Sequence, residues 1–176
     1  MRRKGFPESY DVRRLLDFLI AVKAGRAEAT APVYSHLSYD IVPGRMQHVT
    51  RPDIMIVEGL NLLQTGELHP TRRPNMFVSD FFDFSLYVDA QEADIEEWYV
   101  ARFQTLRRTV FTNEASYFHR YAALSEAEAE EVARGIWRDI NLVNLKENIE
   151  PTRERAHLIL RKDREHDVQS IRLRKL

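Results

Sequence analysis

Two short apolar runs, each followed by a carboxylate, constrain the fold of this chain most strongly. Residues 54–57 read Ile-Met-Ile-Val and lead into Glu58. The apolar-rich segment 82–90 has an acid, Asp89, near its end. A short apolar run of this kind is typical of a strand buried in a parallel sheet. We therefore predict strands within residues 53–63 and 82–90, a third at 157–160 and a fourth at 171–173.

Helical patterns separate these runs. Asp11 is a suitable N-cap for an amphipathic helix that ends at Gly25, and residues 92–108 predict a second helix. Ser125 and Glu128 have the spacing of a capping box and open a third helix that extends to about Asn144. Strands that alternate with helices predict an α/β fold with a mostly parallel sheet flanked by helices. Ligands of such sheets bind at the carboxyl ends of the strands.

Composition excludes several classes of protein. The 176 residues carry 26 Lys and Arg against 27 Asp and Glu, so no basic excess points to nucleic acid or a membrane surface. The absence of cysteine excludes a disulfide scaffold, a thiolate zinc site and a cysteine nucleophile. No apolar run approaches the roughly 18 residues of a membrane span. We expect a soluble cytoplasmic protein that binds neither nucleic acid nor membranes.

Phosphate-binding and metal-binding motifs are missing from the chain. The six glycines are widely spaced, so neither a Walker A loop nor a G-x-G-x-x-G fingerprint can be assembled from them. No histidine pairs with another at the i+3 or i+4 spacing of helical metal ligands. The residues alone therefore predict no glycine-rich phosphate cradle and no histidine metal site.

Two charged residues are candidates for chemistry. Glu58, directly after a predicted strand, could hold Mg²⁺ through water or orient a nucleophile, or it could simply cap the next turn. Arg102 shares a helical face with Ile95, Tyr99 and Leu106. An arginine on an inward face usually has an anionic partner, either a phosphate or a structural carboxylate, and the alternative is a side chain that snorkels to solvent. For Asp89 the pattern favours a helix N-cap over a role in chemistry.

Aromatic residues gather in three places, which allows either a ligand pocket or an ordinary core. The pattern alone favours the core. The groups are Tyr34, His36 and Tyr39; Trp98, Tyr99 and Phe103; and Phe111, Tyr117, Phe118, His119 and Tyr121. The basic tail, residues 161–176, is either a solvated face or an aid to phosphate binding.

Several runs in a fixed order resemble a known family. They are residues 4–11 (KGFPESYD), 31–37 (APVYSHL), 58–61 (EGLN), 78–80 (VSD), 98–103 (WYVARF) and 148–156 (NIEPTRERA). Together they resemble the bacterial type I pantothenate kinases, which belong to the P-loop kinase group. The resemblance extends over essentially the whole chain.

The resemblance implies ATP-dependent phosphorylation of pantothenate to 4′-phosphopantothenate, a step toward coenzyme A, with Mg²⁺ as a cofactor. It also implies a homodimer that coenzyme A inhibits in competition with ATP. By resemblance, Arg102 contacts the transferring phosphoryl group and Glu58 supports magnesium or the nucleophile. The residues implied for coenzyme A or ATP are Lys4, His36, Arg102 and His166, with His166 beside the adenine. Those implied for pantothenate are Tyr34, Tyr39, Tyr99, Asn141, Phe103, Phe111, Tyr117, Phe118 and Tyr121. Leu106 replaces one aromatic of the family's pocket.

The chain also departs from the family pattern. The family's Walker A loop and catalytic aspartate precede the point where the resemblance begins, at Arg2. We therefore expect residues 1–176 to be a single partial domain, the C-terminal portion of a P-loop kinase-like fold without its N-terminal strands. Because both groups stabilise the transition state of phosphoryl transfer, we expect the chain alone to be inactive as a kinase.

Two alternatives remain open at this stage. The first is a non-catalytic fragment that binds coenzyme A or pantothenate. The second is another P-loop small-molecule kinase, similar to uridine kinase, which shares the Glu-Gly strand end but not the other runs. Phosphorylation of uridine rather than pantothenate by a longer version would favour the second.

Overall fold

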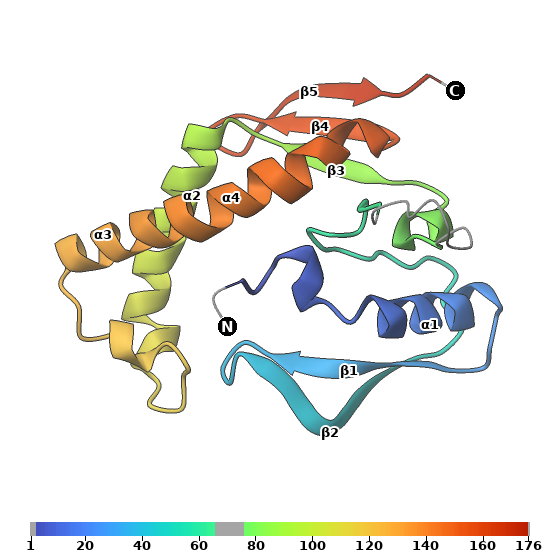
Figure 1. The fold of residues 1–176 in the computed structure, drawn as a ribbon, viewed down its shortest axis with the longest axis horizontal. Helices are drawn as coiled ribbons and strands as arrows, with labels where there is room; N and C mark the ends of the chain where they lie inside the picture. The colour runs from blue at the N-terminus through green and yellow to red at the C-terminus, as the bar shows by residue number, and fades with distance from the viewer. Residues whose placement is uncertain (1–2, 66–75, 176) are drawn as a thin grey trace.

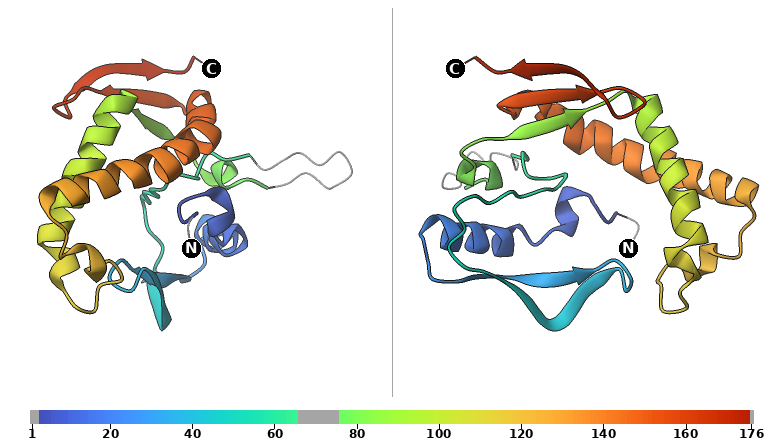
Figure 2. Two further views of the ribbon diagram at one scale, coloured as in Figure 1. Left: turned by 60° about the vertical axis from the view of Figure 1, so that its left-hand side comes forward. Right: turned by 180° about the vertical axis from the view of Figure 1, so that it is seen from behind.

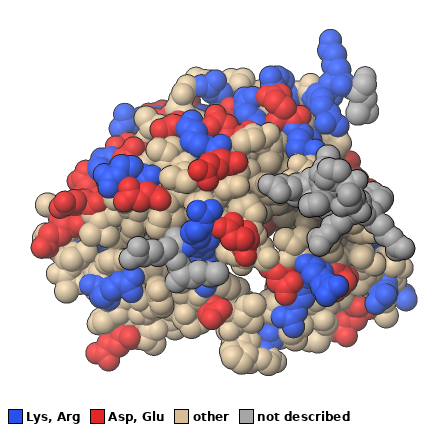
Figure 3. Space-filling view, in the orientation of Figure 1, with Lys and Arg blue, Asp and Glu red and all other residues tan. Residues whose placement is uncertain are grey.

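The computed structural model describes residues 3–65 and 76–175 and has a mixed α/β fold. A three-stranded sheet and a two-stranded hairpin lie at opposite ends, and the helices connect them (Figures 1 and 2). Lys and Arg are interspersed with Asp and Glu over the face drawn in Figure 3. None of the helices in these two ranges is long and apolar enough to cross a membrane.

The three-stranded sheet has the order β3-β4-β5. It consists of β3 (Leu86–Asp89), β4 (Leu158–Lys162) and β5 (Val168–Leu173). β3 and β4 are parallel, with Leu86 opposite Leu158, whereas β4 and β5 are antiparallel. The predicted strands at 82–90, 157–160 and 171–173 are confirmed with shifted ends. Parallel pairing does not predominate among the described strands, because β3–β4 is the single parallel pair of the three.

Two long helices hold the hydrophobic core. α2 (Glu92–Arg108) packs against α3 (Glu126–Ile136), which continues through a π-helical turn at Trp137–Asn141, α4 (Leu142–Asn144) and a second π-helical turn at Leu145–Ile149. The predicted capping box is confirmed, since Ser125 Oγ accepts from the Glu128 amide and Glu128 accepts from the Ser125 amide. The core between the helices contains Val100, Phe103, Phe111, Ala129 and Ala133.

The N-terminal part contains α1 (Val12–Lys23), β1 (Ala29–Ser35) and β2 (Asp40–Val49). Asp11 caps α1 by accepting from the Arg14 amide, as its sequence position predicts. β1 and β2 form an antiparallel hairpin against α1. Sequence reasoning missed β2, whose proline, glycine and mostly exposed polar residues hide its strand character.

The predicted strand within residues 53–63 is wrong for the chain as described. The segment has no ladder partner and runs between α1 and β3 as an irregular trace (Figures 1 and 2). Ile54 and Ile56 are 84% and 89% exposed. An extended segment becomes a strand only when a neighbour satisfies its backbone groups, and no described residue does so here. The exposed edge of β3, with Leu86 and Val88 about half exposed, lacks a described partner as well.

Replacing both exposed isoleucines with lysine, I54K together with I56K, should reduce self-association without unfolding the chain. Exposed apolar strand-like segments promote association, and charged residues oppose it. Because neither side chain is buried, the free energy of unfolding should change by less than about 0.5 kcal/mol per site. Light scattering and urea denaturation measure the two effects. I159K, at a residue only 5% exposed, is the control that should unfold. If the double variant lost as much free energy of unfolding as I159K, the exposed placement of Ile54 and Ile56 would be contradicted.

Candidate functional site

A cavity of about 1130 Å³ lies where α2, the helical segment 137–150 and the carboxyl ends of β3 and β4 meet. Its position agrees with the expectation that ligands of an α/β sheet bind at strand ends. Cavities of this size accommodate small molecules and cofactors. Its lining includes Tyr39, Trp98, Tyr99, Arg102, Trp137, Asn141, Asn144, Lys146, Arg153 and Arg161.

Three predicted site residues meet on one wall of this cavity. Tyr99 and Arg102 are one helical turn apart on α2, and Asn141 ends the π-helical turn at Trp137–Asn141. Burial raises the pKa of the Tyr99 phenol, while the neighbouring Asn141 side chain opposes the rise. The phenol is therefore a neutral hydrogen-bonding group near pH 7. The wall offers a hydroxyl, an amide and a guanidinium to a polar ligand.

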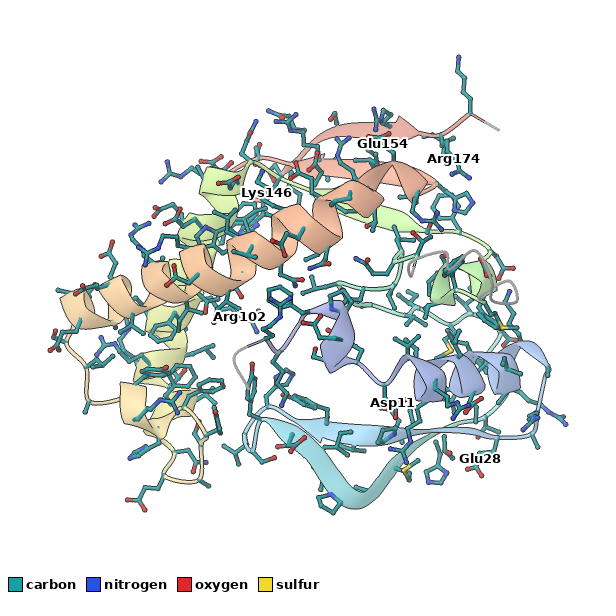
Figure 4. The ribbon with its side chains drawn as sticks, in the orientation of Figure 1. Asp11, Glu28, Arg102, Lys146, Glu154 and Arg174 are labelled. Atoms are coloured by element: carbon teal, nitrogen blue, oxygen red, sulfur yellow. The ribbon has the colours of Figure 1, made fainter. Side chains whose placement is uncertain are left out.

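Arg102 is exposed toward the cavity, and the structure gives it no carboxylate partner among the described residues. In the view of Figure 4 it lies on the side of α2 that faces the N-terminal segment. Of the two partners that its sequence position allowed, the structural carboxylate is therefore not found in the described ranges. A guanidinium in this position can bind a phosphate in bidentate fashion.

Two ion pairs also line the cavity. Arg153 Nη2 lies 2.8 Å from Asp89 Oδ2, and Lys146 Nζ lies 2.9 Å from Glu92 Oε2. Hydrogen bonding to Asp89 raises the pKa of Arg153. The expected N-cap role of Asp89 is wrong, because α2 begins three residues later at Glu92, with Gln91 at its N-cap. Its carboxylate instead joins β3 to the segment before β4.

A second group of predicted residues lies around Tyr39, in the turn between β1 and β2, where the Lys4 ammonium lies 4.1 Å from the Tyr39 ring centroid. The Tyr39 ring stacks on Tyr117 at 5.1 Å and packs edge-on to Phe118 at 4.8 Å. Tyr34 packs edge-on against His36, with ring centroids 5.3 Å apart. Burial raises the pKa of Tyr39, and nearby tyrosines add to the rise. Tyr39 also lines the cavity that contains the Tyr99 wall.

Phe103 and Phe111 lie in the hydrophobic core rather than in the cavity lining. Both are about 95% buried, and their rings are 5.6 Å apart and edge-on. Tyr121 packs against the same core, with its ring centroid 5.4 Å from that of Phe103. These residues therefore support the wall from behind, and a direct contact with ligand remains a prediction.

Glu58 and His166 are not among the residues that line the cavity. Glu58 is exposed, close enough to Tyr10 that its charge contributes to the raised pKa of that phenol, which burial chiefly causes. The His166 ring stacks on Trp98 with centroids 4.1 Å apart, and the Trp98 indole donates to the Arg164 carbonyl. Within residues 3–65 and 76–175 no three His, Asp or Glu side chains are grouped to hold a metal ion.

Sequence reasoning missed several residues that line the cavity, among them Trp137, Asn144 and Arg161. Trp137 and Asn141 are four positions apart in a helix and therefore share a face. This spacing could have identified Trp137 from the predicted residue Asn141. Asn144 and Arg161 carried no such signal. The π-helical turns displace the later residues from an α-helical register, and the sequence does not reveal such turns.

Comparisons with known proteins bear on all of this chain. No protein-family model matches it. Proteins named pantothenate kinase match its full length, with 59% identity over 178 residues in Brevibacillus brevis, 58% over 176 in Mycolicibacterium smegmatis and 57% over 176 in Parvibaculum lavamentivorans. The chain spans 56%, 54% and 54% of these relatives' own lengths.

Proposed function

Because all 176 residues of this chain are homologous to pantothenate kinases, we propose that it carries the pantothenate-binding part of an ATP-dependent pantothenate kinase. The observation that supports this most is the wall formed by Tyr99, Arg102 and Asn141 in a cavity of suitable size. Pantothenate has hydroxyls, an amide and a carboxylate on an apolar frame. The Tyr99 phenol and the Asn141 amide match its hydroxyls and its amide, which leaves the Arg102 guanidinium for a phosphoryl group. The reaction is phosphoryl transfer to an alcohol.

Arg102 is the residue of this chain that we assign to the transferring phosphoryl group. Phosphoryl transfer needs positioning and positive charge more than covalent participation by the protein. An exposed guanidinium without a carboxylate partner in the described ranges keeps its charge for a ligand. Tyr99 and Asn141 would orient pantothenate beside it.

ATP and Mg²⁺ are the co-substrate and cofactor of the proposed reaction. Mg²⁺ is commonly held by one or two carboxylates together with substrate phosphates. Glu58 offers a single exposed carboxylate, so the described residues alone do not make a metal cage. We propose that Glu58 contributes to magnesium or nucleophile positioning only together with ATP.

We also propose that three residues contact the nucleotide or coenzyme A, namely Lys4, His36 and His166. Homodimer formation and inhibition by coenzyme A belong to the same proposal.

The proposed fold is that of a P-loop kinase lacking its first strands. The apolar segment 54–57 and the edge of β3 are both exposed and unpaired among the described residues. Two strand-like edges of this kind suit an additional strand supplied by the remainder of a longer protein. In a second candidate function, this polypeptide alone binds coenzyme A or pantothenate without catalysis. The absence of a glycine-rich phosphate loop from its sequence favours this candidate.

Calorimetric titration of the 176-residue chain with coenzyme A, then with pantothenate, tests the proposal. We expect saturable binding of both and no ATP-dependent turnover of pantothenate. Uridine is the control ligand, and we expect it not to bind. A folded chain that binds neither ligand would overturn the assignment of the cavity. Turnover by this chain would overturn the expected inactivity, and binding of uridine instead would favour a uridine kinase-like relative.

A further inference from the structure

The carbonyl of Gly5 is held by two side-chain amides from distant parts of the chain. Asn61 Nδ2 donates to Gly5 O at 2.9 Å, and Asn144 Nδ2 donates to the same oxygen at 3.0 Å. Asn148 Nδ2 in turn donates to Asn144 Oδ1 at 3.0 Å, which fixes the orientation of the Asn144 amide. We call Asn61 and Asn144, with Gly5 O between them, the asparagine clasp.

The clasp is buried at Asn144 and partly buried at Gly5 and Asn61. Asn144 is only 5% exposed, and it lines the same cavity as Tyr99 and Arg102. Gly5 has φ +99°, a backbone conformation that favours glycine over residues with a side chain. A buried amide that donates to a specific carbonyl stabilises one arrangement of the backbone, because an unsatisfied partner would be costly. The N-terminal segment is therefore fixed at residue 5.

Lys4, the residue before Gly5, depends on this fixed backbone for its position. Its ammonium donates to the Tyr39 carbonyl and lies 4.1 Å from the Tyr39 ring centroid and 5.0 Å from that of Tyr34. No carboxylate of the described residues pairs with it. An ammonium has three donors, so donors remain after the Tyr39 carbonyl is satisfied. The ammonium is thus a positive charge beside Tyr39, a cavity-lining residue, and it can receive an anion.

We propose that Asn144 and Asn61 are positioning residues that hold Lys4 for the phosphate groups of coenzyme A. The inference rests on the proposed function, because it takes coenzyme A as a ligand of the cavity. The two asparagines do not touch the ligand in this account. They fix the backbone at Gly5 and thereby the position of the Lys4 ammonium. The cation–aromatic contacts with Tyr34 and Tyr39 also orient this ammonium.

A double-mutant cycle separates positioning from a general structural effect. The variants are K4M, N144A and N61A, and each asparagine variant is combined with K4M. The ligands are coenzyme A and pantetheine, which shares the same arm but carries no phosphate. We expect K4M to weaken coenzyme A binding about tenfold, the size of one hydrogen bond between charged groups. Each asparagine variant should weaken it severalfold, and neither should add to the effect of K4M.

Pantetheine affinity is the control, and it should stay within about twofold in K4M and N61A. Asn144 itself lines the cavity, so N144A is interpreted through its coupling to K4M and not through pantetheine. Urea denaturation identifies variants that remain folded, and N61A serves if the buried N144A does not fold. Asparagine effects that add fully to K4M, or an N61A effect that weakens both ligands equally, would overturn positioning through Lys4. So would unchanged coenzyme A affinity in N144A and N61A. If the unaltered chain binds pantothenate but not coenzyme A, this inference fails while the pantothenate assignment stands; if it binds neither, both fail.

Discussion

Replacing Phe103 with alanine is expected to destabilise the chain by about 3–5 kcal/mol, the cost of removing a buried phenylalanine. Phe103 is 6% exposed in the core between α2 and α3 and packs against the rings of Phe111 and Tyr121. The void left by the removed ring would lie in the core behind the Tyr99 wall. Ligand binding should therefore be lost together with the fold. Urea denaturation followed by circular dichroism measures the free energy of unfolding.

Two further variants show which role of Phe103 is being measured. F84A changes the same residue type at a position 56% exposed and should cost much less. F103L keeps most of the core volume and should cost about 1–1.5 kcal/mol. If Phe103 contacts ligand directly, F103L should weaken pantothenate binding strongly while the chain remains folded. If it only supports the wall, affinity and stability should fall together and modestly.

The helices were predictable from the sequence because their signals are local. The Asp11 cap, the 92–108 periodicity and the Ser125–Glu128 capping box each specify a helix from neighbouring residues. The apolar run 54–57 carried an equally clear strand pattern, yet its residues are exposed. A strand depends on a partner that can be far away in the sequence, or outside it. The apolar pattern of residues 54–57 indicates that the segment can pair as a strand, but the described residues supply no strand to pair with it.

The site was predictable in part, for a related reason. Tyr99, Arg102 and Asn141 lie on helices whose faces the spacing defines, and the cavity brings them together. Phe103 lies beside Arg102 in the sequence but points into the core, because adjacent helical residues face different directions. The asparagine clasp was not predictable, since it joins residues 5, 61 and 144. Only the tertiary fold places these three residues together.

Replacing Arg102 with methionine is expected to weaken binding of the product, 4′-phosphopantothenate, by about 10- to 100-fold. Charge-assisted hydrogen bonds to a phosphate contribute about 1.5–3 kcal/mol, and methionine keeps the apolar stem while removing the guanidinium. Arg102 is exposed toward the cavity, and its neighbours there are Tyr99 and Asn141, which match the hydroxyls and amide of pantothenate. Calorimetry with product and with pantothenate measures the two affinities separately.

The test compares the change in affinity for 4′-phosphopantothenate with the change in affinity for pantothenate. Pantothenate lacks the phosphate, so R102M should weaken its binding by no more than a fewfold. R108M removes the same charge from an exposed position at the end of α2 that does not line the cavity, so it should leave both affinities unchanged. Equal losses for product and pantothenate would contradict a phosphoryl-binding role, because they would mean that Arg102 acts on the shape of the cavity. Raising the salt concentration should weaken product binding to the unaltered chain more than product binding to R102M, since screening acts on the charge that the variant has already lost.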